Sequence, residues 1–394
     1  MDSLNPGRRA AGVAARDSYG RLLAMLSATT GDLAAVEDAL ADAFERAVRT
    51  WPGQGVPANP DAWLLTVARN RLRDWWKTAE FRRTVALDTE EHAPVHVDEL
   101  DVDAIPDRRL ELMLVCAHPA IDPAVHTPLM LNTVLGFTAD QIGHAFSMSG
   151  PAMATRLVRA KRRIKTAGIP FRIPGRDDLP ARMAAVLEAV YGAHVIDRRL
   201  PGEALHLAEV LTTLVPDDPE ARGLAALVQL SAARAGAREG RFVPLHEQDP
   251  SLWDQRLIAR AHEHLRAAHA RGRLGRFQLE AAIQAVHCAR SGTGTTNWAT
   301  LLDLHRHLQR LAPSLGGAVA LAAVTAEVDG PAAGLELLDG LSAPPFQPAW
   351  VLRAHLLERL GRDGEAGVAY AEALALTRDE SERRYLSEIA RRRR

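Results

Sequence analysis

Apolar residues recur at helical spacing along this chain, and the alternating runs of Val, Ile, Thr and Tyr that are typical of strands are hard to find. Alanine is abundant and aromatic residues make up only 5% of the 394 residues, which also favours helices over sheets. The clearest apolar face contains Leu33, Val36, Leu40, Ala43, Phe44, Ala47 and Val48. The chain is therefore predicted to be all-α.

Helix-capping residues, prolines and glycines predict where further helices begin and end. Asn59 can cap and Pro60 can open a helix after the break at Trp51, Pro52 and Gly53. Helices are also expected at 108–116, 122–135, 138–146 and 150–166, and prolines between 170 and 180 mark a boundary before a long Ala/Leu/Arg-rich helical region. We accordingly divide the chain into residues 1–83, 84–107, 108–176 and 177–394.

Charge is balanced overall but segregated along the chain. The net charge is -1 and the pI is near 7.0, which excludes a uniformly basic nucleic-acid binder. Residues 31–45 are acidic, whereas 69–83 are basic with interleaved aromatic residues. Residues 84–107 hold eight acids and no Lys or Arg, which is typical of an extended acidic linker. Residues 141–176 hold eight bases and no acid.

The stretch from 138 to 166 has the pattern of a helix-turn-helix. Thr138 can cap a short helix whose Ile142 and Phe146 could face a core, and Ser149 can cap the second helix. The second helix would bury Met153, Leu157, Ala160 and Ile164 and expose Thr155, Arg156, Arg159, Arg162 and Arg163. Such an arginine-rich face predicts contact with DNA in the major groove. A solvated basic face on a purely structural helix is the alternative.

Other function classes find little support. No apolar run approaches the roughly 20 residues that span a bilayer, and the first ten residues lack the apolar core of a signal peptide, so a cytoplasmic protein is expected. Cys116 and Cys288 are too few for a disulfide framework or a Cys-based zinc site. The pairs His262/His264 and His305/His307 would each point apart on a helix. Without a Gly-Lys dipeptide there is no Walker A loop, and we expect no enzyme, cofactor or metal.

Three segments at consistent separation carry a family resemblance. Residues 35–52 (AVEDALADAFERAVRTWP), 59–74 (NPDAWLLTVARNRLRD) and 137–165 (FTADQIGHAFSMSGPAMATRLVRAKRRIK) closely resemble domains 2 and 4 of extracytoplasmic-function (ECF) sigma factors of bacterial RNA polymerase. Residues 105–121, the join at 167–174 and the long helical extension look like the subgroup with a fused tetratricopeptide-like domain, often called ECF42-like.

The resemblance implies roles for three sets of residues. Domain 2 would dock on the β′ clamp helices of core polymerase through Asp38, Asp42 and Phe44, although an ordinary amphipathic helix would show the same pattern. The minus-10 element would be contacted by Arg69, Asn70, Arg73, Trp75, Trp76 and Lys77, with at most one of the two tryptophans exposed and with Trp63 in the core. The minus-35 element would be contacted by Thr155, Arg156, Arg159 and Arg162.

The resemblance also covers the connecting and flanking surfaces. Domain 4 would meet the β flap of polymerase with the rest of its surface. The linker at 84–107 would run toward the RNA exit path, where carboxylates mimic nucleic-acid charge, or would serve as a plain flexible tether.

The C-terminal region contains one good match to a tetratricopeptide unit. Its packing positions are occupied by Trp350, Ala354, Leu357, Gly361, Ala366, Tyr370 and Ala373. Helix pairs of this kind stack into a concave surface that could bind a protein or peptide partner. An irregular helical bundle without a ligand is the alternative.

Two functions remain open at this point. The first is a sigma factor that binds core RNA polymerase and promoter DNA, with the fused repeats as its regulator. The second is a helix-turn-helix DNA-binding regulator with a tetratricopeptide-like scaffold that acts independently of polymerase. The acidic helix that carries Asp38 and Asp42 distinguishes them, because a simple repressor does not need it.

Overall fold

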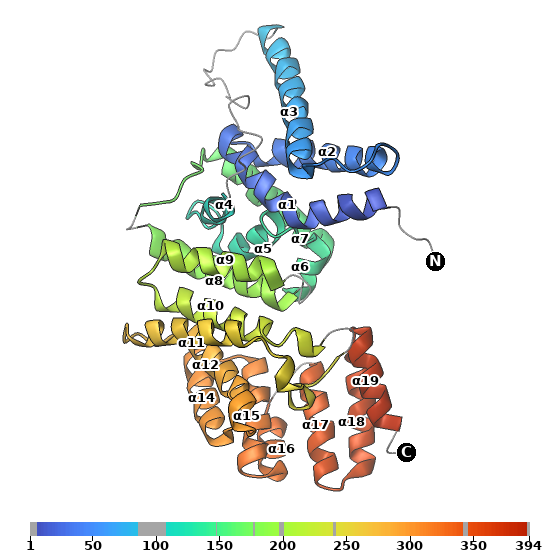
Figure 1. The fold of residues 1–394 in the computed structure, drawn as a ribbon, viewed down its shortest axis with the longest axis vertical. Helices are drawn as coiled ribbons and strands as arrows, with labels where there is room; N and C mark the ends of the chain where they lie inside the picture. The colour runs from blue at the N-terminus through green and yellow to red at the C-terminus, as the bar shows by residue number, and fades with distance from the viewer. Residues whose placement is uncertain are drawn as a thin grey trace. The chain divides into compact units, whose positions relative to one another are not determined.

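A computed structural model describes residues 6–85, 108–146, 148–175, 178–196, 201–238, 242–341 and 346–391. Within these ranges the regular structure is helical and contains no strand, which confirms the all-α prediction (Figure 1). The chain divides into two compact units, residues 1–207 and 208–394. The acidic linker predicted at 84–107 lies, from residue 86 onward, outside the described residues.

The first unit begins with three helices that pack on one another: α1 (Pro6–Thr30), α2 (Leu33–Gln54) and α3 (Pro60–Val85). Gly31, with φ of 67°, makes the tight turn between α1 and α2. Asn59 caps α3 as predicted, because its Oδ1 accepts a hydrogen bond from the N–H of Ala62 at 3.1 Å. The predicted apolar face of α2 is buried except at its edge, where Phe44 is half-buried and Val48 is 45% exposed. Val48 therefore lies at the solvent edge of the predicted apolar face.

Four further helices match the predicted ranges closely: α4 (Arg109–Cys116), α5 (Pro123–Thr133), α6 (Ala139–Ala145) and α7 (Gly150–Thr166). They are followed by α8 (Leu179–Ile196), for which no separate range was predicted. Helix α8 packs against α4 and α5, and Arg182 donates a hydrogen bond to the carbonyl of Leu114 at 3.0 Å. The predicted division at residue 177 assigns α8 to the C-terminal region. The structure shows that its packing partners belong to the first unit, while the functional boundary stays a prediction.

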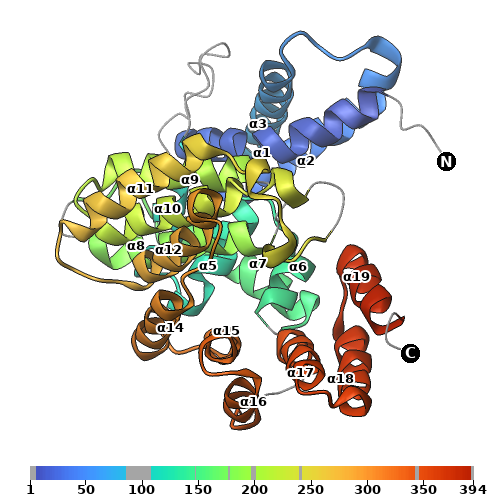
Figure 2. The same ribbon diagram turned by 60° about the horizontal axis from the view of Figure 1, so that its bottom comes forward.

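The division between the units falls within α9 (Pro201–Leu214). The second unit continues with α10 (Pro219–Ala232), three short 3-10 helices at Gly236–Arg238, Leu245–Glu247 and Pro250–Leu252, α11 (Gln255–His269), α12 (Arg276–Cys288), α13 (Arg290–Thr293), α14 (Trp298–Leu311), α15 (Leu315–Val328), α16 (Pro331–Asp339), α17 (Gln347–Arg359), α18 (Asp363–Leu376) and α19 (Glu380–Arg391). From α14 to α19 each helix packs on the next along the chain, and α17 and α18 run side by side (Figure 2). Helices stacked in this order bury a continuous core.

Candidate nucleic-acid interface

Helices α6 and α7 form a tight helix-turn-helix. Thr138 and Gln141 make a reciprocal capping box at the start of α6. The turn favours glycine at 143, because a Cβ there would lie 2.8 Å from the carbonyl oxygen of Met148, whereas a Cβ on Gly150 would meet only the movable side chain of Asp140. Two details differ from prediction. Ser149 occupies the cap position of α7 without a side-chain hydrogen bond, and Phe146 is 42% exposed because it lies at the end of α6.

The two faces of α7 are separated as predicted. Met153, Leu157, Ala160 and Ile164 are buried. Thr155, Arg156, Arg159, Arg162 and Arg163 are exposed. The hydroxyl of Thr155 donates to the carbonyl of Pro151 within the helix, whereas Arg163 donates to the carbonyl of Ala120. The exposed arginines at 156, 159 and 162 thus present a cationic surface with the reach to contact phosphates or base edges.

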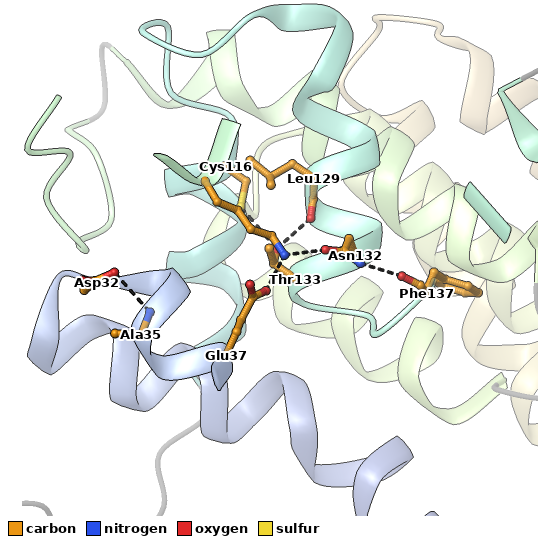
Figure 3. A network of polar contacts seen from close by, with 9 residues as sticks. Asp32, Ala35, Glu37, Cys116, Leu129, Asn132, Thr133 and Phe137 are labelled. Atoms are coloured by element: carbon orange, nitrogen blue, oxygen red, sulfur yellow. Dashed lines mark hydrogen bonds and ion pairs between the residues drawn. The ribbon is translucent and has the colours of Figure 1, made fainter. Parts of the chain in front are cut away.

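Two lysines of α7 point the other way, toward α2. The ammonium of Lys161 donates to Oε1 of Glu37 at 2.6 Å and to Oδ1 of Asn132 at 2.7 Å (Figure 3). One turn further on, Lys165 pairs with Oδ2 of Asp32 at 2.6 Å. Both lysines belong to the acid-free basic stretch at 141–176, yet in the structure carboxylates of another segment pair with them. Their carboxylate partners lie 124 and 133 positions away in the chain, so no local pattern could reveal them.

The same contact is partly dehydrated. Burial raises the pKa of Glu37 more than the neighbouring Lys161 lowers it. Burial also raises the pKa of the Cys116 thiol to about 12, while its Sγ lies 3.5 Å from the hydroxyl of Thr133 (Figure 3). Cys116 is therefore an unreactive core thiol at neutral pH.

Helix α3 carries the residues expected to contact the minus-10 element. Asn70, Trp75 and Lys77 are exposed, and Trp75 shows 45% of its surface. Arg69, Arg73 and Trp76 are half-buried, and Arg73 donates to Oδ1 of Asn70 at 3.0 Å. Trp63 is half-buried and meets the buried Trp51 edge-on, with ring centroids 5.5 Å apart. One tryptophan at the predicted surface is thus available for stacking on a base.

Helix α2 carries the residues expected to dock on polymerase. Asp38 and Asp42 are exposed, and Asp42 accepts a hydrogen bond from Nε of Arg71 on α3 at 2.5 Å. Phe44 is half-buried with its ring 6.2 Å from that of Tyr19 on α1. Burial, with added repulsion from Glu37 and Asp38, raises the pKa of Tyr19. This surface therefore offers two carboxylates beside the edge of an aromatic ring.

In the second unit, α17 and α18 form a helical hairpin at the expected positions. Ala354, Leu357, Ala366, Tyr370 and Ala373 are buried between the helices, and Trp350 packs against the same cluster. Gly361, with φ of 72°, lies in the turn between α17 and α18. Small residues at these positions allow the helices to approach, and the Tyr370 ring fills the remaining space.

A cleft of about 740 Å³ lies in the second unit and is lined by Arg222, Arg256, Ala259, Arg260, Glu263, His264 and Ala267. Two of its arginines already bind the protein itself: Arg260 pairs with Glu209 at 2.8 Å, and Arg222 donates to the carbonyl of Pro216. Among the described residues no group of three His, Cys, Asp or Glu side chains could hold a metal ion. Nor does any helix in the described part of the chain combine the length and apolarity needed to cross a membrane.

Comparison with known protein families gives matches in two parts of the chain. Residues 15–82 match the family model of sigma-70 region 2, and residues 182–269 match a family of unknown function (DUF6596). The chain is 34% identical to the uncharacterized protein R00370 of Rhizobium meliloti (strain 1021) over 373 aligned residues. The alignment covers 89% of this chain and 88% of that protein. No solved structure matches.

Proposed function

This chain belongs to the family of the Rhizobium meliloti protein R00370 and carries a sigma-70 region 2, and from that premise we propose that it is a sigma factor of the extracytoplasmic-function type. In this role it binds core RNA polymerase and directs transcription initiation at a dedicated set of promoters. Its working compartment is the cytoplasm, where polymerase and chromosome are found.

One observation carries the proposal: an exposed acidic helix and an exposed basic, aromatic helix lie next to each other in the segment that matches region 2. Asp38 and Asp42 on α2 are exposed, and α3, which packs on α2, exposes Asn70, Trp75 and Lys77. Carboxylates suit a basic protein partner, whereas cations and an aromatic ring suit unstacked single-stranded bases. A simple DNA-binding regulator needs only the second of these surfaces.

The proposed roles of the three surfaces follow from the family resemblance. Asp38, Asp42 and the exposed edge of Phe44 dock on the β′ clamp helices. The residues on α3 hold the minus-10 element: Arg69, Asn70, Arg73, Trp75, Trp76 and Lys77. The outer face of α7 reads the minus-35 element through Thr155, Arg156, Arg159 and Arg162, while the remaining surface of the α4–α7 region meets the β flap.

The second unit acts in this scheme as a regulator that binds a protein or peptide partner. Its successive helix pairs and the α17–α18 hairpin, with Ala354 and Ala373 at the close approach, support a tetratricopeptide-like repeat. This assignment to the ECF42-like subgroup rests on the resemblance and on that hairpin.

The direct test is in vitro transcription with purified core polymerase and the full chain. Promoters are first selected from random DNA by the reconstituted holoenzyme, and transcripts from the selected templates are then measured with and without the chain. Transcription that depends on the chain supports the proposal. Failure to bind core polymerase, together with sequence-specific DNA binding by α7, would establish the polymerase-independent regulator instead.

A further inference from the structure

The cleft in the second unit has the size of a small-molecule site, because its volume of about 740 Å³ falls in the range of known ligand pockets. One wall is formed by residues of α11 that recur every three or four positions and so share one face: Arg256, Ala259, Arg260, Glu263 and Ala267. Arg222 lines the cleft from α10, the helix that packs beside α11 (Figure 1). The cleft is therefore built by two neighbouring helices of one unit.

Glu209 on α9 fixes the position of one cleft arginine. Its Oε2 accepts a hydrogen bond from Nη2 of Arg260 at 2.8 Å. Its Oε1 accepts one from the amide of Gln229 and lies 3.4 Å from Nε2 of His264. Gln229 and His264 are only 1% and 8% exposed, so buried groups hold the carboxylate in place. Since this contact uses a single nitrogen of Arg260, the remaining N–H groups of the guanidinium can bind a ligand.

Two more arginines bring unused hydrogen-bond donors to the cleft. Arg222 donates through Nε to the carbonyl of Pro216 at 3.0 Å, which orients the side chain and leaves its two terminal nitrogens for a ligand. The guanidinium of Arg256 has no hydrogen-bond or ion-pair partner among the described residues, and it lies one helical turn before Arg260. Planar guanidinium groups bind phosphoryl and carboxylate oxygens in forked pairs. The cleft therefore offers an anion three such groups.

The cleft also contains a carboxylate without a cation. Glu263 is exposed on α11, and in the part of the chain that the structure describes no Lys, Arg or His pairs with it. A carboxylate only accepts hydrogen bonds, and neighbouring hydroxyl groups of a sugar are a common partner for one in nucleotide-binding proteins. From Arg256 to Glu263 the wall extends two turns of α11, or about 10 Å, which is comparable to the length of a phosphorylated sugar.

His264 adds no charge to this arrangement. Burial lowers the pKa of its ring, although the nearby Glu209 opposes the shift, so the imidazole is neutral at pH 7. Its Nδ1 finds no hydrogen-bond partner among the described residues. The positive charge in the cleft therefore comes from the arginines alone, and it is separated from the free acceptor at Glu263.

We propose that this cleft binds a small molecule that carries both a phosphoryl group and neighbouring hydroxyl groups, namely a phosphorylated sugar, either free or as part of a nucleotide. Arg222, Arg256 and Arg260 contact the phosphoryl oxygens, and Glu263 accepts hydrogen bonds from the hydroxyls. The small side chains of Ala259 and Ala267 leave room for the body of the ligand. None of these residues belongs to the surfaces proposed to bind polymerase or promoter DNA, so the inference goes beyond the proposed function.

Isothermal titration calorimetry on the full chain tests the site with pyrophosphate, ribose 5-phosphate, ADP and adenosine. The three phosphorylated probes should bind, whereas adenosine, which has hydroxyls but no phosphoryl group, should not. If ribose 5-phosphate binds as tightly as ADP, the ligand is a free sugar phosphate. If ADP binds more tightly, the ligand is a nucleotide.

Arg256→Ala should weaken the binding of each phosphorylated probe about 10- to 100-fold, because one hydrogen-bonding cation is lost. The guanidinium of Arg256 has no partner among the described residues, so its removal leaves the fold intact, which far-ultraviolet circular dichroism checks. Arg266→Ala is the matched control, because Arg266 is exposed on the same helix and does not line the cleft. It should leave all affinities unchanged.

Glu263→Gln separates the sugar from the phosphate. The variant loses the acceptor for the hydroxyls and also loses a carboxylate that repels any anion. Pyrophosphate has no hydroxyl for Glu263 and experiences only the second change. The ratio of the affinity for ribose 5-phosphate to that for pyrophosphate should therefore fall about 10-fold. Glu372→Gln, on the exposed side of α18, is the control for the charge change and should leave this ratio as it is.

Three results would overturn the proposal. The first is the absence of binding heat for every phosphorylated probe at millimolar concentration, or binding of adenosine as tight as that of ADP. The second is an equal loss of affinity in Arg256→Ala and Arg266→Ala, which would indicate unspecific attraction to a basic helix. The third is an unchanged affinity ratio in Glu263→Gln. All titrations are done without polymerase and DNA, so they decide the site independently of whether the chain acts as a sigma factor.

Discussion

One contact in each unit shows that the two units bury different kinds of side chain. At the α2–α7 contact the first unit buries a charged pair, Glu37 and Lys161, drawn from helices far apart in sequence. The α17–α18 hairpin of the second unit buries apolar residues instead, and elsewhere in that unit burial lowers the pKa values of His287 and His305. A buried charged pair regains hydration when its contact opens, whereas apolar packing gains nothing. The first unit is therefore suited to exchanging partners, and the second to remaining intact as a scaffold.

The largest expected effect tests whether apolar packing holds the α17–α18 hairpin of the second unit together. Tyr370 is 5% exposed between α17 and α18, so Tyr370→Ala should destabilise the second unit by about 3–5 kcal/mol. Tyr370→Phe removes only the hydroxyl that donates to Glu358 at 3.3 Å and should cost about 1 kcal/mol. Hydrogen exchange would show the loss of protection in peptides from α17 and α18. An equal loss in α1–α3 would mean that the units do not differ in the way described.

The next effect concerns the acidic surface of α2 in the first unit. Asp38→Lys with Asp42→Lys should weaken binding to core polymerase about 100-fold, or about 3 kcal/mol, because two carboxylates that face a basic partner become repulsive. Binding of duplex DNA by α7 should not weaken. Fluorescence anisotropy with labelled core polymerase measures the first quantity, and Glu372→Lys, exposed on α18, is the matched charge control. Equal losses in the control would show that net charge, not the α2 surface, sets the affinity.

Acidification should destabilise the second unit through protonation of His287. Burial, with Arg234, His305 and Arg290 nearby, lowers the pKa of His287 from 6.5 to about 4. Between these values the unfolded chain binds a proton that the folded one does not, so stability is present above pH 6.5 and is lost as the pH falls toward 4, by at most about 3 kcal/mol. The pKa of Glu37 is raised, so lowering the pH relieves the cost of burying its carboxylate and acts in the opposite direction.

Urea unfolding at a series of pH values, followed by the fluorescence of Trp298, reports on this histidine. The Trp298 ring meets His287 edge-on with centroids 6.2 Å apart. To isolate the Trp298 signal, the other six tryptophans are replaced by Phe in both the parent protein and the His287→Phe variant. The variant should lose less stability than the parent between pH 6.5 and pH 4. The same loss in the variant would assign the pH dependence to other groups, such as His264 and His305.

The sequence predicted what depends on local spacing and failed where distant parts meet. The α7 faces and the Asn59 cap follow from residues within a few helical turns of each other, and the α17–α18 hairpin follows from a repeat motif within 24 consecutive residues; the structure shows all three. The partners of Lys161 and the approach of Gly20 to Val134 depend on how helices from two segments dock. Periodicity cannot specify such docking. One signal was available: Gly20 lies within an otherwise helix-favouring stretch, where glycine needs a packing reason.

The smallest effect asks whether the exposed face of α7 reads DNA or is merely solvated. Arg156→Ala should reduce initiation at the selected promoter about 10-fold, equivalent to about 1.4 kcal/mol, because a guanidinium that reads a base edge contributes this much discrimination. If Arg156 reads a base, the loss should concentrate at one base pair of the minus-35 element. If it binds phosphate, affinity should fall on every sequence and the salt dependence should decrease by about one ion. Arg172→Ala is the control, because Arg172 is exposed beyond the end of α7. Unchanged initiation and unchanged promoter selection would remove α7 from the DNA interface and leave α3 as the only candidate surface.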